Sequence, residues 1–114
     1  MSLAVRKNLA EHPPCPLSQC MAIIGGALTV NIIWFLSEQP RRFNELRVDI
    51  PAISAKVLSA RLKELVENGV IVRHVKETSP PSVEYALTEV GTELLPVIHE
   101  IIAVGKKLQQ RSHP

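Results

Sequence analysis

The clearest alternation of apolar and polar positions lies in the middle of the chain, over residues 54–68. Its apolar members follow the spacing i, i+4, i+7 and i+8, which places side chains on one buried face of a helix: Leu58, Leu62, Leu65 and Val66. Ser54 is a residue type that caps helix N-termini, and Gly69 is the type that accepts the left-handed backbone just past a helix. The pattern predicts an amphipathic helix over 54–68 whose other face is free.

Three shorter helices are predicted before it. Residues 17–24 form a short segment that is apolar on one side, with Ser18 as its candidate N-cap. Residues 28–36 are apolar almost all round, as in a buried helix, and Pro40 ends the segment. Residues 42–48 carry two apolar side chains three positions apart and stop before a proline, which predicts a short third helix.

The pattern changes to that of strands after residue 69. β-branched residues over 70–75 and apolar–polar alternation over 83–87 predict two strands, joined by a proline-rich turn at 79–82. Thr88 then caps a last helix that runs to about residue 110. Pro96 falls inside this helix, and we expect it to bend the helix or delay its start.

This order of elements predicts an α+β fold that is mainly helical. It is a winged helix-turn-helix with a two-stranded wing and terminal dimerisation helices. A chain of 114 residues is long enough for one domain and too short for two. We expect residues 17–110 to form that domain, with an extended proline-rich arm over 1–16 and a tail over 111–114.

Basic residues concentrate in the middle of the chain. Residues 41–76 hold eight basic and four acidic side chains, a net charge of +4 within a chain of net charge +2. Such a segment is typical of a module that binds a polyanion. The candidates for contact with duplex DNA lie on or directly before the two predicted helices and on the first strand of this segment: Arg41, Arg42, Ser54, Lys56, Ser59, Arg61, Lys63, Arg73 and Lys76. The alternative is a solvated helix face and a solvated hairpin, on which His74 also lies.

Few residues suggest catalysis or metal binding. The four histidines are scattered, and Gly25-Gly26 stands alone instead of forming a phosphate-binding loop. His12, Cys15 and Cys20 have the composition of a metal site but give only three ligands at irregular spacing. We therefore predict no enzymatic activity, no cofactor and no metal.

Cys15 is the one residue with a possible reactive role. It lies among prolines just before a predicted helix, where a thiol has a lowered pKa and becomes more reactive. The alternative is an inert small residue at the edge of the domain. Cys20 is expected on the apolar side of the same helix, in the core.

No segment predicts a membrane span or a signal peptide. The longest apolar run, residues 21–36, is interrupted by two glycines and two polar residues. The first residues have basic side chains but no apolar stretch behind them. We expect a cytoplasmic protein whose cysteines stay reduced unless one serves as a sensor.

The last helix has more apolar positions than one face of a small domain can bury. They occupy a wide arc: Leu94, Leu95, Ile98, Ile101 and Ile102. Because exposing such a patch is disfavoured, we predict a two-fold homodimer through this helix, helped by the first short helix.

Two segments are specific enough to indicate a family. They are Arg41-Arg42-Phe43-Asn44-Glu45-Leu46 and Val83-Glu84-Tyr85-x-Leu87-Thr88, supported by Cys15-Pro16, Ile24-Gly25-Gly26 and the leucines of 54–68. With these residues the chain resembles the HxlR family of bacterial winged-helix regulators, relatives of the MarR type. The resemblance implies a homodimer with two recognition helices on DNA, and it matches Cys15 to the cysteine that some members use to sense oxidants or electrophiles. Members usually carry Lys-Trp where this chain has Ala27-Leu28.

The function predicted from these observations is a sequence-specific, duplex DNA-binding transcription regulator that acts as a homodimer, with Cys15 as a candidate thiol switch. The alternative is a winged-helix module for protein–protein contact without a DNA role.

Overall fold

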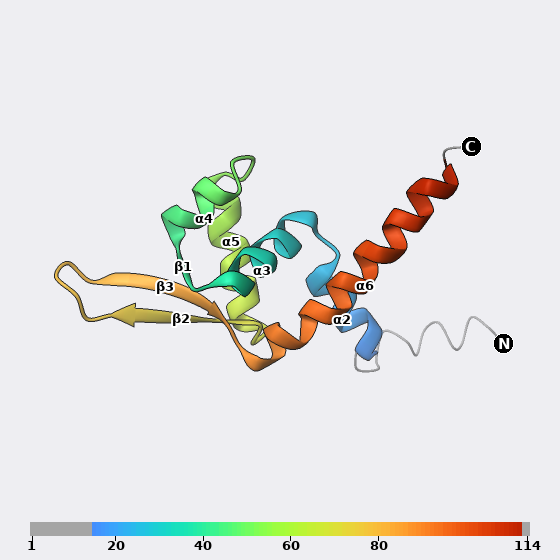
Figure 1. Ribbon diagram of the computed structural model, residues 1–114. Coiled ribbons are helices and arrows are strands. Elements are labelled where there is room, and N and C mark those ends of the chain that lie inside the picture. The colour runs from blue at the N-terminus through green and yellow to red at the C-terminus, as the bar shows by residue number, and fades with distance from the viewer. Residues whose placement is uncertain (1–14, 113–114) are drawn as a thin grey trace.

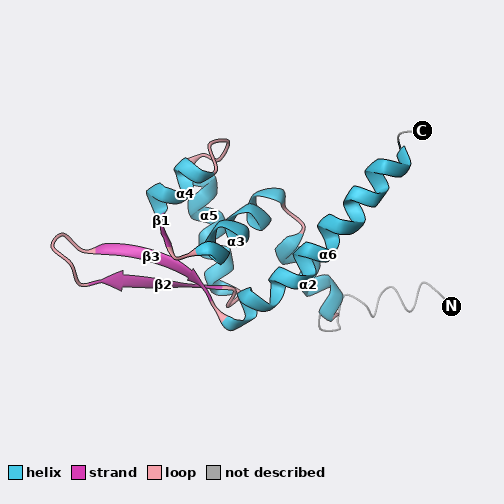
Figure 2. Ribbon diagram, viewed as in Figure 1, coloured by secondary structure: helices cyan, strands magenta, loops and turns pink. Residues whose placement is uncertain are grey.

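The computed structural model describes residues 15–112, and its elements follow the predicted order with one additional strand (Figure 1). In chain order they are α2 (Pro16–Ile24), α3 (Ala27–Glu38), β1 (Arg41–Arg42), α4 (Phe43–Asp49), α5 (Ala55–Glu67), β2 (Ile71–Lys76), β3 (Ser82–Leu87) and α6 (Glu89–Ser112). The mainly helical α+β class is confirmed (Figure 2). The expected extended arm lies, except for its last two residues, outside the described residues, as does the end of the tail.

The core lies where α3, α4 and α5 meet. Ile32, Ile33, Leu46, Leu58 and Leu62 are almost completely buried there. Helices α3 and α4 therefore form the platform that holds α5 by its apolar face. Burying side chains of this size contributes about 1.5–3 kcal/mol each.

The apolar face of α5 is narrower than predicted. Leu58, Leu62 and Leu65 are buried, but Val66 is 36% exposed, so its assignment to the buried face was wrong. With about 3.6 residues per turn, Val66 falls at the edge of the stripe, where it lines a groove toward the wing instead of the core.

The sheet has three antiparallel strands in the order β1-β3-β2. The hairpin of β2 and β3 is the predicted wing, and it projects from the helical body (Figure 1). Strand β1 was not predicted, because two residues are too few to show a period-2 pattern. It pairs Arg41 with Tyr85 and Arg42 with Glu84.

The helix starts are set by local hydrogen bonds. Ser54 caps α5 as predicted, since its side-chain oxygen accepts a hydrogen bond of 3.2 Å from the Val57 N–H. The predicted cap of α2 at Ser18 was wrong: Cys15 is the N-cap and Pro16 is the first helical residue. Proline suits that position because its missing N–H has no partner to lose there.

Helix α6 is continuous from Glu89 to Ser112 and includes Pro96, so the proline does not delay its start. Thr88 lies just before it, and its Oγ1 accepts a hydrogen bond of 3.2 Å from the Gly91 N–H. The same hydroxyl lies 2.6 Å from the Gly69 carbonyl oxygen, to which it donates. The second half of α6 extends away from the body (Figure 1).

Over residues 15–112, no single helix is both long and apolar enough to cross a membrane. The pair α2 and α3 meets the length and composition requirement only together, with an 83° bend between its two helices.

Candidate nucleic-acid interface

The exposed face of α5 carries the side chains predicted to contact DNA. Lys56, Ser59 and Lys63 are all exposed, and helical geometry places them on one face, away from the buried leucines. Ser54 lies at the N-terminal end, where its hydroxyl is used as the cap. This face begins at a helix N-terminus without acidic residues in the first turn.

Arg61 does not share that face. It lies about half a turn from Ser59 and Lys63 around the helix axis. It is half-buried, and its Nη1 lies 3.0 Å from the Glu64 Oε1. The expectation that Arg61 faces the same groove is therefore corrected: it borders the buried stripe on the opposite side.

The wing distributes its basic residues over both faces of the sheet. Tyr85 lies opposite Arg73 on one side and Arg41 on the other, so these three share a face. Tyr85 packs against the core, so this is the face toward the helices. Lys76, by alternation along β2, points to the other face, and the predicted pair of Arg73 and Lys76 is thus split.

The outer face of the sheet carries a cluster around Glu84. Arg42 and His74 lie directly opposite Glu84 in the neighbouring strands. The Lys76 Nζ lies 3.5 Å from the Glu84 Oε1. Lys76 and Arg42 are therefore exposed cations on the same face, with one carboxylate between them.

Arg41 is held inside the protein. Its side chain is only 15% exposed and lies between two carboxylates, 2.7 Å from Glu38 and 3.3 Å from Asp49. Both partners belong to the same chain and offset its charge, so Arg41 lies outside the exposed basic surface and its DNA contact stays a prediction. Arg41 instead joins the end of α3 to the end of α4.

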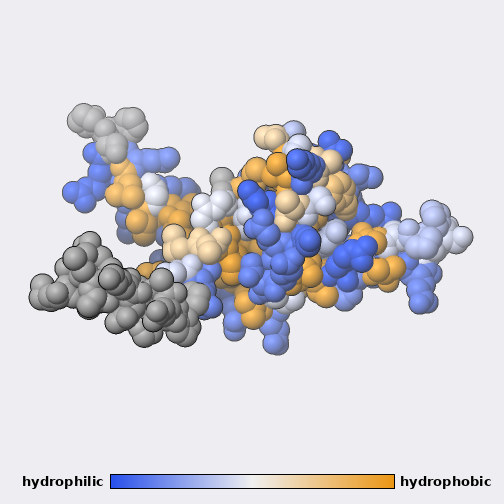
Figure 3. Space-filling model, turned by 180° about the vertical axis from the view of Figure 1, so that it is seen from behind, coloured by the Kyte–Doolittle hydropathy of each residue, from blue (hydrophilic) through white to orange (hydrophobic). Residues whose placement is uncertain are grey.

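A groove lies between α5 and the wing. Its polar lining comes from both elements: Ser59, Lys63 and Glu67 on α5, and Arg73 and Tyr85 on the strands. The groove joins the exposed face of α5 to Arg73, whose position relative to α5 could not be predicted from sequence patterns. Figure 3 shows the molecule from behind, with hydrophilic side chains gathered over the middle of the molecule.

The two cysteines are both exposed, in different environments. The Cys15 Sγ lies 3.2 Å from the Ser18 hydroxyl and accepts a hydrogen bond of 3.3 Å from the Ser18 N–H. These bonds lower the pKa of the Cys15 thiol, with the Ser18 hydroxyl having the largest effect. Cys20 was expected in the core, which is wrong, because α2 buries only Ile24 and leaves Cys20 in a shallow hollow.

The predicted dimer residues of α6 fall into two groups. Leu94 and Ile98 pack in the domain's own core, so their assignment to an interface is corrected, and Leu95 is half-buried. Ile101 and Ile102 are exposed. Val97, Val104 and Leu108, which the predicted dimer set does not include, are exposed as well, and their helical spacing from Ile101 is visible in the sequence.

No cluster of three or more metal-ligating side chains occurs within residues 15–112. His12, the third member of the set considered with the two cysteines, lies outside this range.

Comparison with known proteins assigns the fold to a family. The model of the HxlR-like helix-turn-helix family matches residues 23–113. YdeP of Bacillus subtilis, an uncharacterized HTH-type transcriptional regulator, is 40% identical over 109 residues, which cover 96% of this chain and 85% of YdeP. YodB of the same organism, an HTH-type transcriptional regulator, is 40% identical over 90 residues, covering 78% of this chain and 80% of YodB.

Solved structures of transcriptional regulators have the same fold as this chain. The reduced form of B. subtilis YodB superposes with a TM-score of 0.73 at 39% identity, covering 80% of this chain and 90% of that one. The redox regulator HypR in its oxidized form gives 0.74 at 33% identity, covering 82% and 96%. YodB has also been solved bound to quinone. These relatives are transcriptional regulators and not enzymes.

Proposed function

Because this chain belongs to the HxlR-like helix-turn-helix family of transcriptional regulators, we propose that it binds duplex DNA sequence-specifically as a homodimer. The observation that carries the proposal is the exposed face of α5. Its three leucines are buried inside the chain, while Lys56, Ser59 and Lys63 face outward.

The charge order along α5 supports this role. Lysines lie in its first and middle turns, and Glu64 and Glu67 lie near its end, which is the unfavourable order for a helix dipole. DNA phosphates at the N-terminus supply the negative charge that the first turn lacks. Ala55 and Ser59 are small, so the helix can approach base edges closely in a major groove.

The wing supplies phosphate contacts beside the helix. Arg73 lines the groove next to Lys63 and Ser59, where a backbone strand bordering the major groove would pass. Arg42 and Lys76 extend the basic surface on the outer face of the sheet. Contacts of this kind fix the register of the protein on the duplex without reading sequence.

Exposed apolar residues at the two terminal helices support a homodimer. Leu17 and Met21 on α2 are exposed, as is the second half of the apolar stripe of α6. A two-fold dimer sets two α5 helices on half-sites about one helical turn of DNA apart. We place this regulator in the cytoplasm, where its DNA is.

The thiol of Cys15 is the proposed point of response. A lowered pKa gives a larger share of thiolate, which is the reactive nucleophile. The thiolate adds to an electrophilic carbon, as in a quinone, and the quinone oxygen takes a proton from water. The relatives YodB and HypR were solved with a quinone bound and in an oxidized state, respectively.

A charge-removal experiment tests DNA binding. The double variant Lys56→Ala, Lys63→Ala should weaken binding to its operator by about tenfold or more and lower the salt slope by about two units. Arg61→Ala is the matched control: it removes a cation from the same helix but on another side, so affinity and slope should stay near native. Binding and salt slope unchanged in the double variant would exclude this face.

The same titration separates the alternative function. A module used only for protein–protein contact would show no salt-dependent binding of the native protein to any fragment of its source genome. Selection of bound genomic fragments, followed by footprinting, identifies the operator when binding is present.

A further inference from the structure

The groove between α5 and the wing has an apolar side and a charged side. On α5, Leu62 and Val66 lie one helical turn apart on the side toward the core. Lys63 and Glu67 lie one turn apart on the outer side of the same helix. The groove has a volume of ≈ 390 Å³, which is within the range of sites that bind small molecules.

The wall that the sheet contributes has the same two properties. Arg73 and Tyr85 lie opposite each other in adjacent strands, and both line the groove. Tyr85 is half-buried against the core and adds an aromatic surface to the apolar side. Arg73 is exposed and lies on the wall opposite Lys63. The groove therefore has one cation on each wall above an apolar floor.

These two cations are not neutralised by the chain itself. Arg41 and Lys76 each lie beside a carboxylate of the same chain. Within residues 15–112, Lys63 and Arg73 have no such partner. Two free cations on opposite walls can both donate hydrogen bonds to one carboxylate placed between them. Glu67 lines the same groove, and its negative charge disfavours a ligand with a second carboxylate.

The phosphates of DNA use only the charged side of the groove. A phosphate accepts hydrogen bonds from Lys63 and Arg73 but gains nothing from an apolar surface. Val66 stays 36% exposed and lines the groove beside Leu62 and Tyr85. An apolar floor beneath two cations suits a ligand that has both an apolar body and one negative charge.

We propose that this groove binds a small organic acid with one carboxylate and a flat apolar ring system, and that the bound acid excludes DNA. The carboxylate lies between Lys63 and Arg73, and the rings pack against Val66 and Tyr85. In the proposed function DNA uses the same two cations, so acid and duplex compete for them. The competition rests on the proposed function, whereas binding of the acid does not.

Calorimetric titration of the full native chain with 2-naphthoate tests the site. Two matched probes separate the parts of the ligand: 2-naphthalenemethanol has the rings without the charge, and inorganic phosphate has charge without the rings. Naphthoate should bind about tenfold more tightly than either probe. Equal binding of the alcohol would mean that the cations take no part, and equal binding of phosphate that the apolar floor takes none. Either result, or no saturable binding of naphthoate, refutes the proposal.

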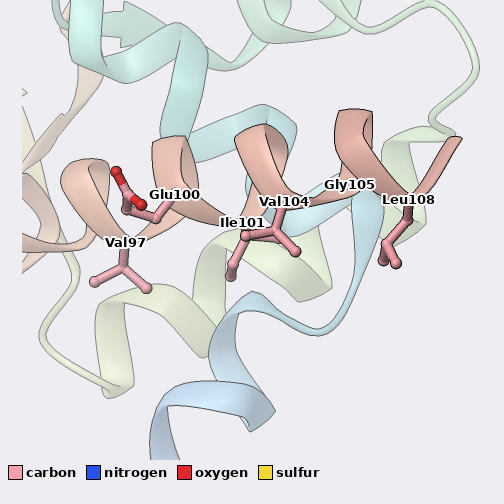
Figure 4. Close-up of a pocket in the computed structure, with 6 residues that line it drawn as sticks. All are labelled: Val97, Glu100, Ile101, Val104, Gly105 and Leu108. Atoms are coloured by element: carbon pink, nitrogen blue, oxygen red, sulfur yellow. The ribbon is translucent and has the colours of Figure 1, made fainter. Parts of the chain in front are cut away.

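A second groove, along α6, is apolar as well and offers the rings another surface. Figure 4 shows the side chains that line it, which include the carboxylate of Glu100 and no cation. This groove therefore favours the alcohol over naphthoate, since Glu100 repels a negative charge. A preference for naphthoate thus identifies the groove between α5 and the wing.

Three substitutions separate binding of the acid from binding of DNA. Val66→Asn removes an apolar contact without changing charge, so it should weaken naphthoate about fivefold and leave DNA affinity unchanged when no acid is present. Lys56→Ala removes a cation that does not line the groove, so it should weaken DNA binding and leave naphthoate affinity unchanged. Arg73→Ala should weaken both. Thermal unfolding shows that each variant is folded, and naphthoate binding that neither Val66→Asn nor Arg73→Ala alters would refute this site.

Titration of the operator in the presence of the acid tests the exclusion. At a naphthoate concentration equal to its own dissociation constant, the apparent dissociation constant of the operator should double. Unchanged operator affinity in a chain saturated with naphthoate would refute the competition. If the native chain binds naphthoate but no DNA fragment, the proposed function fails and the acid site stands. If it binds the operator but no naphthoate, only the acid site is wrong.

Discussion

Helices α5 and α6 carry similar apolar stripes but use them differently. In α5 the stripe ends within the body, and Leu58, Leu62 and Leu65 are all buried by the same chain. In α6 only Leu94 and Ile98 are buried in this way, and the stripe then continues over Ile101, Val104 and Leu108 into solvent.

The residues that each helix leaves exposed after folding indicate which kind of surface it offers to a partner. Folding buries the three leucines of the α5 stripe, so what remains exposed on that helix, apart from Val66 at its edge, is a mostly polar face with two lysines, suited to a polyanion. On α6 the unexplained part is apolar, which is suited to another protein surface. The two helices thus present surfaces suited to different kinds of partner, although their sequences show the same periodicity.

The largest expected effect separates the two stripes by stability. Leu62→Ala on α5 should lower the free energy of unfolding by about 2–5 kcal/mol, because it leaves a cavity in the core. Ile101→Ala on α6 removes a side chain of similar size but should change it by less than about 0.5 kcal/mol in the dissociated chain. Urea unfolding measures both changes when the protein concentration is kept below the dissociation constant of the proposed dimer.

An equal loss in the two variants would show that the second half of α6 folds back onto its own domain. It would remove the distinction on which the α6 interface depends.

A second prediction sharpens the assignment of the polar face. Arg73→Ala should weaken operator binding and lower the salt slope by about one unit, since Arg73 lines the groove beside Lys63. Lys76→Ala should have a smaller effect, because Lys76 lies on the other face and is paired with Glu84. Fluorescence anisotropy at several salt concentrations compares them, and a larger effect from Lys76 would place the DNA on the outer face of the sheet.

Thr88 connects the two helices, and its replacement should have a moderate effect. Thr88→Val keeps the shape but removes the cap of α6 and the hydrogen bond to the Gly69 carbonyl beyond α5. We expect a loss of about 1 kcal/mol in the free energy of unfolding. Thr88→Ser keeps the hydroxyl and is the control, so it should stay close to native in the same urea titration.

The smallest expected effect concerns α2. Like the second half of α6, this helix leaves apolar side chains exposed, namely Leu17 and Met21. In a Cys20→Ser background, Ser18→Ala removes the hydroxyl that most lowers the pKa of Cys15. The midpoint of the alkylation rate against pH should therefore shift upward, toward the ordinary thiol value. Iodoacetamide labelling followed by mass spectrometry measures it, and an unmoved midpoint would assign the lowered pKa to another cause.

Local signals in the sequence predicted much of the fold. The stripe and the Ser54 cap defined α5, and Thr88 gave the start of α6, because both depend on residues within one or two turns. The specific segments around Arg42 and Glu84 indicated the family. Strand β1 was missed because its two residues have meaning only when paired with β3.

The errors arose where tertiary contacts decide. From the sequence Arg41 is expected to be a free cation, but the fold brings Glu38 and Asp49 into contact with it. From the sequence Cys20 is expected in the core, but α2 contacts the body mainly through its last turn and leaves Cys20 exposed. Whether such a side chain is buried or exposed depends on which helices and strands pack together, and the local sequence pattern does not determine that packing.

The three-stranded sheet that contains the wing is attached to the helices at both of its edges. On one edge Arg42 belongs to the sheet, and its N–H donates a hydrogen bond of 2.7 Å to Glu45 in the first turn of α4. On the other edge the Val70 N–H donates to the carbonyl oxygen of Leu65 on α5. These hydrogen bonds set the spacing between α5 and the wing within the chain itself. In the DNA complex that we propose, the duplex has to adapt to this spacing, so base steps that bend or narrow easily are favoured even where no side chain touches them.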